Sequence, residues 1–200
     1  GAVLENKADL GIIFDTDVDR MSAVLPDGQQ ISRNALIAMM AAILAPDYPG
    51  STIITDSGTS DELADFLENK LHLKHHRYMR GYKNVINKQI ELNKEGIDCP
   101  LAIETSGHAA FRENYYLDDG AYLVTKLIIK AALLKKSGGS LESFISDLEE
   151  PAEELERRFK IDLEDFNPYG EKVIADLKAL AEERDGWQAE KINYEGIRIN

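Results

Sequence analysis

Short apolar runs alternate with longer stretches of helical periodicity along most of the chain. The runs at 10–14, 51–55 and 99–103 have the length and composition of short strands. Between and after them we expect helices over residues 33–44, 60–71, 85–95, 121–136, 141–148 and 169–183. Strands that alternate with helices are typical of βαβ units, so the pattern predicts an α/β fold.

Turn and capping residues separate these elements. Residues 20–31 alternate loosely around Pro26-Asp27-Gly28, a turn signal that predicts a hairpin. A further strand-like stretch at 194–199 follows the last predicted helix. The residues expected to cap helices are Ser32, Asp118 or Asp119, and Ser140.

Composition supports a packed core and argues against two classes of partner. Hydrophobic residues make up 44% of the 200 residues, which is enough for a core. The net charge of -13 argues against nucleic acid or an anionic membrane as partner, because both need Lys and Arg to meet their phosphates, whereas a small phosphorylated ligand needs only a local basic pocket. No run approaches the roughly 18 apolar residues of a membrane span. Cys99 is the single cysteine and residues 1–7 are unlike a signal peptide, so we expect a cytoplasmic setting.

Three aspartates, Asp15, Asp17 and Asp19, follow the first predicted strand at alternate positions. A turn at a strand end can bring such carboxylates around one point, where a cation relieves their repulsion. Oxygen-only ligands suit a hard cation, and Mg²⁺ is the first candidate. Arg20 follows, and its planar guanidinium suits a phosphate. An EF-hand is excluded because Arg20 and Pro26 occupy the places of its glycine and glutamate, whereas an acidic turn with solvated charges fits these residues too.

A second polar cluster, Glu104-Thr105-Ser106-Gly107-His108, follows the predicted strand at 99–103. Ligands bind at strand ends in open α/β sheets. Glu104 can accept hydrogen bonds from hydroxyl groups, Ser106 can donate and accept, and His108 can donate or transfer a proton. This chemistry suits a polyol such as a sugar, although a polar turn without a ligand fits the same residues.

Five segments resemble, in order, motifs of the α-D-phosphohexomutase family, which contains the phosphoglucomutases and phosphomannomutases. Residues 8–20 resemble its Mg²⁺ loop, usually D-G-D-G-D-R, and residues 104–108 resemble its E-x-S-G-H sugar-recognition loop. The other segments are Gly81-Tyr82-Lys83, Asp118-Asp119-Gly120 before a helix, and Tyr194-Glu195-Gly196-Ile197-Arg198. Glu195 stands where Asp is commoner. Thr16 and Val18 replace small residues of the metal loop, and because Val adopts positive φ poorly, we expect a somewhat different loop shape.

The resemblance implies a three-layer α/β/α domain with a small, mostly parallel mixed sheet. It assigns residues 1–30 to the end of a second domain, 31–148 to a third domain, and 149–200 to a linker and the start of a fourth. The family's phosphoserine loop and fourth-domain phosphate loop are not among these 200 residues. We therefore expect a part of a larger enzyme that turns over no substrate by itself. Its first strand should be mobile, re-paired within the chain, or paired with a second copy.

For the whole enzyme, the resemblance implies reversible transfer of phosphate between C1 and C6 of a hexose, through a phosphoserine and a bisphosphorylated sugar. Asp15, Asp17 and Asp19 would bind Mg²⁺, which neutralises charge on the phosphoserine. Arg20 would orient the phosphate or a nearby acid.

The resemblance also implies roles for residues of the third domain. Glu104 and Ser106 would bind sugar hydroxyls, while Lys83 and His108 would contact substrate, and either could assist proton transfer. The implied partners are a hexose phosphate and the remaining domains of the enzyme, with an activator of the glucose 1,6-bisphosphate type.

Two other functions fit parts of the sequence. Haloacid-dehalogenase-type phosphatases also place D-x-D at a strand end, but they need a threonine soon after the second aspartate, where this chain has Val18-Asp19-Arg20. A stand-alone sugar-phosphate-binding or scaffold module without catalysis remains the alternative.

Overall fold

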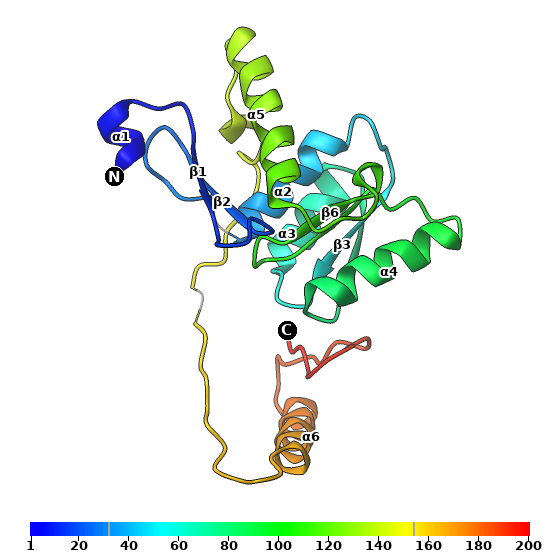
Figure 1. Cartoon of the computed structure of the whole chain (residues 1–200). Coiled ribbons are helices and arrows are strands. Elements are labelled where there is room, and N and C mark those ends of the chain that lie inside the picture. The colour runs from blue at the N-terminus through cyan, green and yellow to red at the C-terminus, as the bar shows by residue number, and fades with distance from the viewer. Residues whose placement is uncertain (32, 154) are drawn as a thin grey trace. The chain divides into compact units, whose positions relative to one another are not determined.

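The computed structural model describes residues 1–31, 33–153 and 155–200, which form two compact units. The first unit is Gly1–Pro151 and the second is Ala152–Asn200. Each is described by itself below (Figure 1). The domain limits expected from the sequence stay a prediction.

A four-stranded mixed sheet forms the centre of the first unit. Its order is β4 (Lys74–Tyr78), β3 (Thr52–Asp56), β5 (Leu101–Ile103) and β6 (Ala109–Phe111). β3 pairs in parallel with β4 and β5, and β6 runs antiparallel to β5. The predicted α/β class with a mostly parallel sheet is confirmed. The pattern did not reveal β4, whose polar residues suit an edge strand, or the three-residue β6.

Helices cover both faces of this sheet, as the alternation of side chains along β3 requires. Ile53 belongs to a core cluster that includes α2 (Arg33–Leu44) and α5 (Gly120–Lys136). The next residue, Ile54, packs instead in a cluster with α4 (Tyr82–Lys94) on the opposite face. Figure 1 shows α4 and α2 on different sides of β3. The result is a three-layer α/β/α domain.

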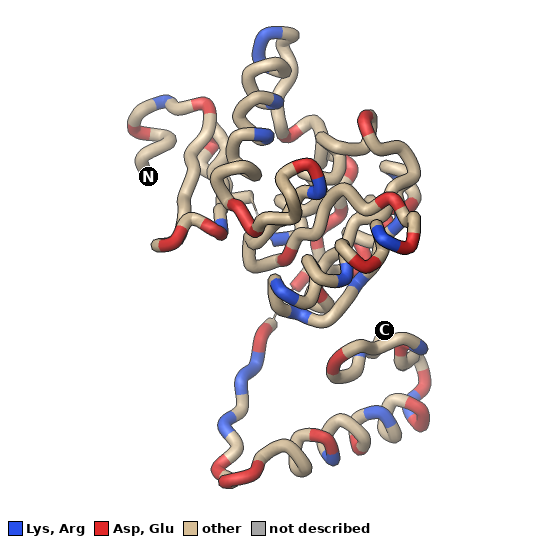
Figure 2. Tube along the Cα trace, turned by 45° about the vertical axis from the view of Figure 1, so that its right-hand side comes forward, with Lys and Arg blue, Asp and Glu red and all other residues tan. Residues whose placement is uncertain are grey.

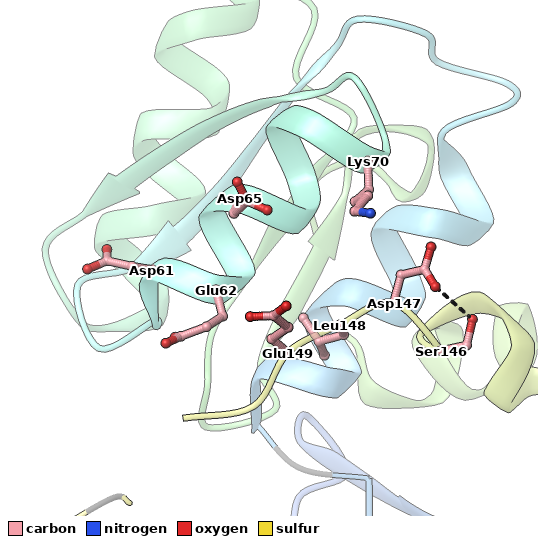
Figure 3. Close-up of a pocket in the computed structure, with 8 residues that line it drawn as sticks. All are labelled: Asp61, Glu62, Asp65, Lys70, Ser146, Asp147, Leu148 and Glu149. Carbon is pink, nitrogen blue, oxygen red and sulfur yellow. Dashed lines mark hydrogen bonds between the residues drawn. The ribbon is translucent and has the colours of Figure 1, made fainter. Parts of the chain in front are cut away.

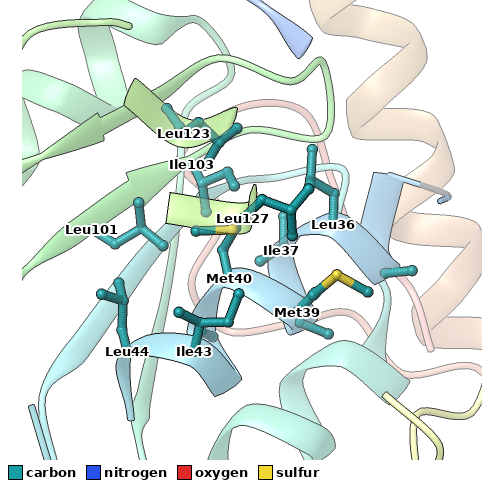
Figure 4. Close-up of a cluster of buried hydrophobic side chains, with 14 of the residues drawn as sticks. Leu36, Ile37, Met39, Met40, Ile43, Leu44, Leu101, Ile103, Leu123 and Leu127 are labelled. Atoms are coloured by element: carbon teal, nitrogen blue, oxygen red, sulfur yellow. The ribbon is translucent and has the colours of Figure 1, made fainter. Parts of the chain in front are cut away.

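The larger core is built around α2. All ten residues from Ala35 to Leu44 are buried, as expected for a helix that is apolar nearly all round. Figure 4 shows Met40 on the side of α2 that faces Leu101, Ile103 and Leu127, and Met39 pointing away from them. Each large apolar side chain buried in this way stabilises the fold by roughly 1.5–3 kcal/mol.

The predicted helix limits are largely confirmed in the first unit, with one clear error. The second predicted helix is α3 (Asp61–Asp65), capped by Ser60, followed by a π-helical turn η1 (Phe66–Lys70). Asp119 rather than Asp118 caps α5. Ser32 lies outside the described residues.

The predicted helix at 141–148 is wrong, because the structure has only a 3₁₀ turn, η3 (Leu141–Phe144), within this range. Two serine hydroxyls there donate to backbone carbonyls, Ser143 to Ser140 at 2.6 Å and Ser146 to Ser143 at 3.4 Å. Such bonds offer the backbone an alternative to a longer helix.

A separate hairpin precedes this domain, after the short helix α1 (Ala2–Asn6). β1 (Gly11–Phe14) pairs antiparallel with β2 (Met21–Val24), and Phe14 lies opposite Met21. β1 is therefore paired within the chain, one of the three outcomes expected for it. The predicted turn around Asp27 returns the chain as far as a bridge between Val24 and Gln30.

The second unit contains α6 (Asn167–Glu183), which begins with Pro168 in its first turn. Acidic and basic residues are interspersed along it and along the approach to it (Figure 2). The strand predicted at 194–199 is not formed, and a single bridge joins Ala189 to Ile199. Among the described residues, no helix is both long and apolar enough to cross a membrane.

Candidate functional site

The loop that joins β1 to β2 gathers three carboxylates. One oxygen each from Asp15, Asp17 and Asp19 lie within 4.8 Å of one another. Arg20 closes the loop, because its Nε donates to Asp15 Oδ2 at 2.6 Å and its backbone N–H donates to Asp15 Oδ1 at 3.2 Å. Val18 takes a φ of 65°, so a β-branched residue occupies the left-handed conformation that glycine adopts more readily.

The electrostatics of this loop suit a hard cation. Burial raises the pKa of Asp15, but the hydrogen bonds and charge of Arg20 outweigh it, so this pKa lies below its ordinary value. Asp19 Oδ1 is buried without a hydrogen-bond partner among the described residues, and Arg20 Nε lies 3.8 Å away. A buried carboxylate oxygen left unpaired is costly. The donor set and this unpaired oxygen fit Mg²⁺.

Two glycines bring other parts of the chain against this loop. A Cβ added to Gly107 would lie 2.6 Å from the carbonyl oxygen of Met21, and Gly107 has a φ of 97°. A Cβ added to Gly120 would lie 2.8 Å from the carbonyl oxygen of Val18. The turn after β5 and the start of α5 therefore pack directly on the backbone of the β1–β2 hairpin and its acidic loop.

His108 connects the acidic loop with the turn after β5. Its Nδ1 lies 2.7 Å from Asp118 Oδ2 and 3.7 Å from Asp19 Oδ2. Its ring stacks on Tyr82, with centroids 5.0 Å apart and an interplanar angle of 23°. Lys83 Nζ lies 5.7 Å from the centroid of the same Tyr82 ring. The structure thus brings Lys83, His108 and the predicted metal ligands to one region.

Glu104 is held at the same edge of the sheet. It is 3% exposed, and its Oε1 accepts a 2.6 Å hydrogen bond from the Gly81 N–H. Burial raises the pKa of Glu104, and the Gly81 hydrogen bond opposes this shift without cancelling it. Ser106 is exposed at the tip of the turn. The eight residues predicted from the sequence are therefore found on three neighbouring segments.

Asp56 was missed by sequence reasoning. It ends β3, is fully buried, and accepts hydrogen bonds from the backbone N–H and the hydroxyl of Thr105, both at 2.8 Å. Arg80 Nε lies 3.5 Å from its Oδ2. The signal for Asp56 was the polar turn that directly follows the buried strand, but we interpreted this turn as the start of a helix.

A hollow elsewhere on the first unit shares no residue with this cluster. It has a volume of about 490 Å³ and lies between α3 and residues 146–149 (Figure 3). Five of its eight lining side chains are acidic: Asp61, Glu62, Asp65, Asp147 and Glu149. Its lining contains no histidine and none of the residues predicted from the sequence, so the candidate site is the cluster at the sheet edge.

The fold and site define a three-layer α/β/α domain that presents an acidic loop beside a polar strand-end turn. The model of the phosphoglucomutase/phosphomannomutase alpha/beta/alpha domain III matches residues 32–151. The chain therefore belongs to the phosphoglucomutase/phosphomannomutase family.

Curated relatives agree with this assignment. A phosphomannomutase/phosphoglucomutase of Pseudomonas putida is 26% identical over 200 residues, which cover 99% of this chain and 40% of that protein. A phosphoglucosamine mutase of Campylobacter concisus is 32% identical over 142 residues, or 69% of this chain and 30% of that protein. This chain thus spans less than half the length of both relatives.

Solved structures show the same fold. A phosphoglucomutase/phosphomannomutase family protein of Burkholderia thailandensis matches with a TM-score of 0.78 and 26% identity, over 99% of this chain and 39% of that one. A phosphomannomutase described as putative, from Thermus thermophilus, matches with a TM-score of 0.61 and 16% identity, over 100% and 40%.

Proposed function

We propose that this chain supplies the metal-binding and sugar-binding parts of a phosphohexomutase. The reaction would move a phosphate reversibly between C1 and C6 of a hexose, through a phosphoserine and a bisphosphorylated sugar. The observation that carries the proposal is the meeting of two motif segments far apart in sequence, with Asp19 Oδ2 3.7 Å from His108 Nδ1. The relatives named as mutases support it.

Asp15, Asp17 and Asp19 would hold Mg²⁺ in this proposal. The bound cation would neutralise charge on a phosphoserine supplied by another part of the protein. Arg20, which is paired with Asp15 at 2.6 Å, would keep the loop closed and orient a phosphate. A structural neighbour from Aspergillus fumigatus, an N-acetylphosphoglucosamine mutase, was solved with GlcNAc-6P and magnesium, which is consistent with this chemistry.

Glu104 and Ser106 would bind hydroxyl groups of the sugar. Oε1 of Glu104 is engaged by Gly81, so its second oxygen is the acceptor left for a ligand. His108 is held through Nδ1, which leaves Nε2 for the substrate. Lys83 would contact substrate from the adjacent turn, and either it or His108 would move a proton. The other domains of the enzyme, a glucose 1,6-bisphosphate-type activator and a cytoplasmic setting are part of the same proposal.

Metal binding is tested by adding Mn²⁺, a paramagnetic substitute for Mg²⁺, to the ¹⁵N-labelled chain. Amide signals of residues 15–20 and 107–109 should broaden first. Asp17→Asn should abolish this selectivity. Asp27→Asn is the matched control, because it removes the same charge from the exposed turn that follows β2. Uniform broadening in the wild type would contradict the assigned ligands.

Sugar recognition and catalysis need separate tests. Glucose 1,6-bisphosphate should shift amides of residues 81–83 and 104–108, and Glu104→Ala should remove these shifts. A longer protein that carries these 200 residues and a serine loop should interconvert hexose 1- and 6-phosphates, with Asp17→Asn strongly reducing turnover. Binding without turnover in that longer protein would favour the alternative, a sugar-phosphate-binding or scaffold module.

A further inference from the structure

Asp56 is a buried charge to which the proposed reaction gives no role. It is 0% exposed and stands at the carboxyl end of β3, the central parallel strand. An ionised carboxylate in such a place is costly unless hydrogen bonds and a cation compensate it. Most of the groups that compensate Asp56 come from the turns after the strands on either side, and the Gly58 N–H of its own turn adds a 3.4 Å hydrogen bond to Oδ2.

On one side, Asp56 holds the turn that contains the proposed sugar-binding residues. Oδ1 accepts from the Thr105 N–H and Oδ2 accepts from the Thr105 hydroxyl, both at 2.8 Å. Thr105 lies between Glu104 and Ser106, the two residues proposed to bind hydroxyls. The contact spans 49 residues of sequence, so it fixes the turn relative to β3 rather than relative to its own strand.

On the other side, Asp56 faces the turn that follows β4. Arg80 Nε lies 3.5 Å from Oδ2, and the arginine side chain is 62% exposed while that of Asp56 is 1% exposed. The next residue, Gly81, donates its N–H to Glu104 Oε1 at 2.6 Å. Two carboxylates therefore link the turns that follow β4, β3 and β5. Asp56 contacts Thr105 and Arg80, one in each neighbouring turn. Glu104, in the turn after β5, contacts Gly81 in the turn after β4.

We propose that Asp56 is a positioning residue that sets the conformation of the 104–108 turn, and through it the place of Glu104 and Ser106. The significance for sugar binding rests on the proposed function, whereas the conformational effect does not. Asp56 touches no proposed ligand, and it acts through Thr105 and Arg80. Aspartate fits this role because both of its carboxylate oxygens accept hydrogen bonds and its negative charge pairs with Arg80.

Local hydrogen exchange in the 200-residue chain separates positioning from general stability. The reporters are the amides of Gly107, which donates to Glu104 O at 3.0 Å, and Gly81, whose acceptor is Glu104 rather than Asp56. Thr105→Val removes one hydroxyl donor and should lower protection of both amides about ten-fold relative to amides of α2, in line with one hydrogen bond to a charged group. Thr105→Ser should restore it.

Asp56→Asn is the second variant, because it keeps the shape and removes the charge and one acceptor. Asp61→Asn is its control, since Asp61 is also paired with an arginine, Arg77 at 2.7 Å, but begins α3 and has a side chain that is 50% exposed. We expect loss of protection at Gly81 and Gly107 in Asp56→Asn and none in Asp61→Asn. Unchanged protection in Thr105→Val and Asp56→Asn would overturn the proposal, as would an equal loss across α2.

Titration with glucose 1,6-bisphosphate tests whether the conformation set by Asp56 also affects sugar-phosphate affinity. If the wild-type chain binds it, Thr105→Val should weaken binding several-fold and Thr105→Ser should not, and equal affinity in all three would overturn the link to sugar binding. If the wild type shows no binding, sugar recognition by this chain fails, while the exchange data still decide the positioning role of Asp56.

Discussion

Gly120 is the position at which one added methyl group tests the packing of the metal loop most directly. It is the first residue of α5. A Cβ there would lie 2.8 Å from Val18 O, 3.1 Å from Asp19 C and 3.2 Å from Arg20 C. All three are backbone atoms, so no side-chain rotation can relieve the contacts. Gly120→Ala must therefore move either the loop or the helix.

Two effects of Gly120→Ala oppose each other. Alanine exceeds glycine in helix propensity by up to about 1 kcal/mol. Overpacking against fixed atoms typically costs about 1–3 kcal/mol. Because Gly120 is at the helix start, where propensity counts least, the clash should dominate and destabilise the first unit by roughly 1–2 kcal/mol. For a unit of this size, the corresponding fall in Tm is about 2–8 °C.

The assay is urea unfolding together with amide spectra of the metal loop. Gly170→Ala is the control, because Gly170 lies in α6 and a Cβ there would meet nothing within 4 Å. That substitution should increase the helicity of α6 without destabilising the first unit. If Gly120→Ala were as stable as the wild type, with unshifted amides at residues 15–20, the inferred contact between α5 and the loop would be refuted.

Three further substitutions test other parts of the first unit. In Asp118→Asn, His108 should lose its preference for the Nδ1-protonated tautomer, which long-range ¹H–¹⁵N spectra of the imidazole report; an unchanged pattern would exclude Asp118 as its anchor. Leu127→Ala should destabilise by about 2–5 kcal/mol in urea unfolding, against less than about 1 kcal/mol for the 59% exposed Leu133→Ala. Burial raises the pKa of Glu104 above its ordinary 4.5, so its contribution to stability is fully present below that value and is lost as pH rises through the raised pKa. Glu104→Gln should therefore gain stability relative to the wild type as the pH rises above 4.5, and a pH-independent difference would contradict the shift.

The parts of the fold that local patterns encode could be predicted from the sequence. The apolar strands at β3 and β5 and the continuous apolar helix α2 were found because burial dictates their composition. The helix at 141–148 was predicted wrongly, since apolar residues there have helical spacing while serine side chains bond to the backbone instead. Strand β4 was not predicted because it lies at the edge of the sheet, where its residues are only partly buried and four of the five are charged or histidine.

In the candidate site, too, residues in short local motifs could be predicted, whereas a residue whose partner is distant in sequence could not. The aspartates of the metal loop and Glu104 stand in short motifs, so their residue types suffice to suggest chemistry. Asp56 stands in no such motif, and its partner Thr105 is 49 residues away. No local pattern records which buried carboxylate will meet which turn, because that depends on strand order, and strand order was not predictable here. The register of β3 with β4 and β5 is what places Asp56 between the two turns.

The acidic loop of residues 15–20 and the turn of residues 104–108 are in direct contact, although they adjoin different sheets. Gly107 and Gly120 let the backbones of the β5 turn and of α5 touch the loop, and Met21 N–H donates to Gly107 O at 3.4 Å. His108 adds a side-chain link, with Asp118 on one side and Asp19 on the other. In the proposed function, a cation that draws Asp15, Asp17 and Asp19 together would therefore shift groups that also position His108. If that cation changed the affinity of the 104–108 turn for a ligand, the ligand would change the affinity for the cation by the same factor, because such coupling is reciprocal. Because Gly107 and Gly120 pack directly on the backbone of residues 18–21, a movement of the acidic loop should be accompanied by a movement of the 104–108 turn and the start of α5.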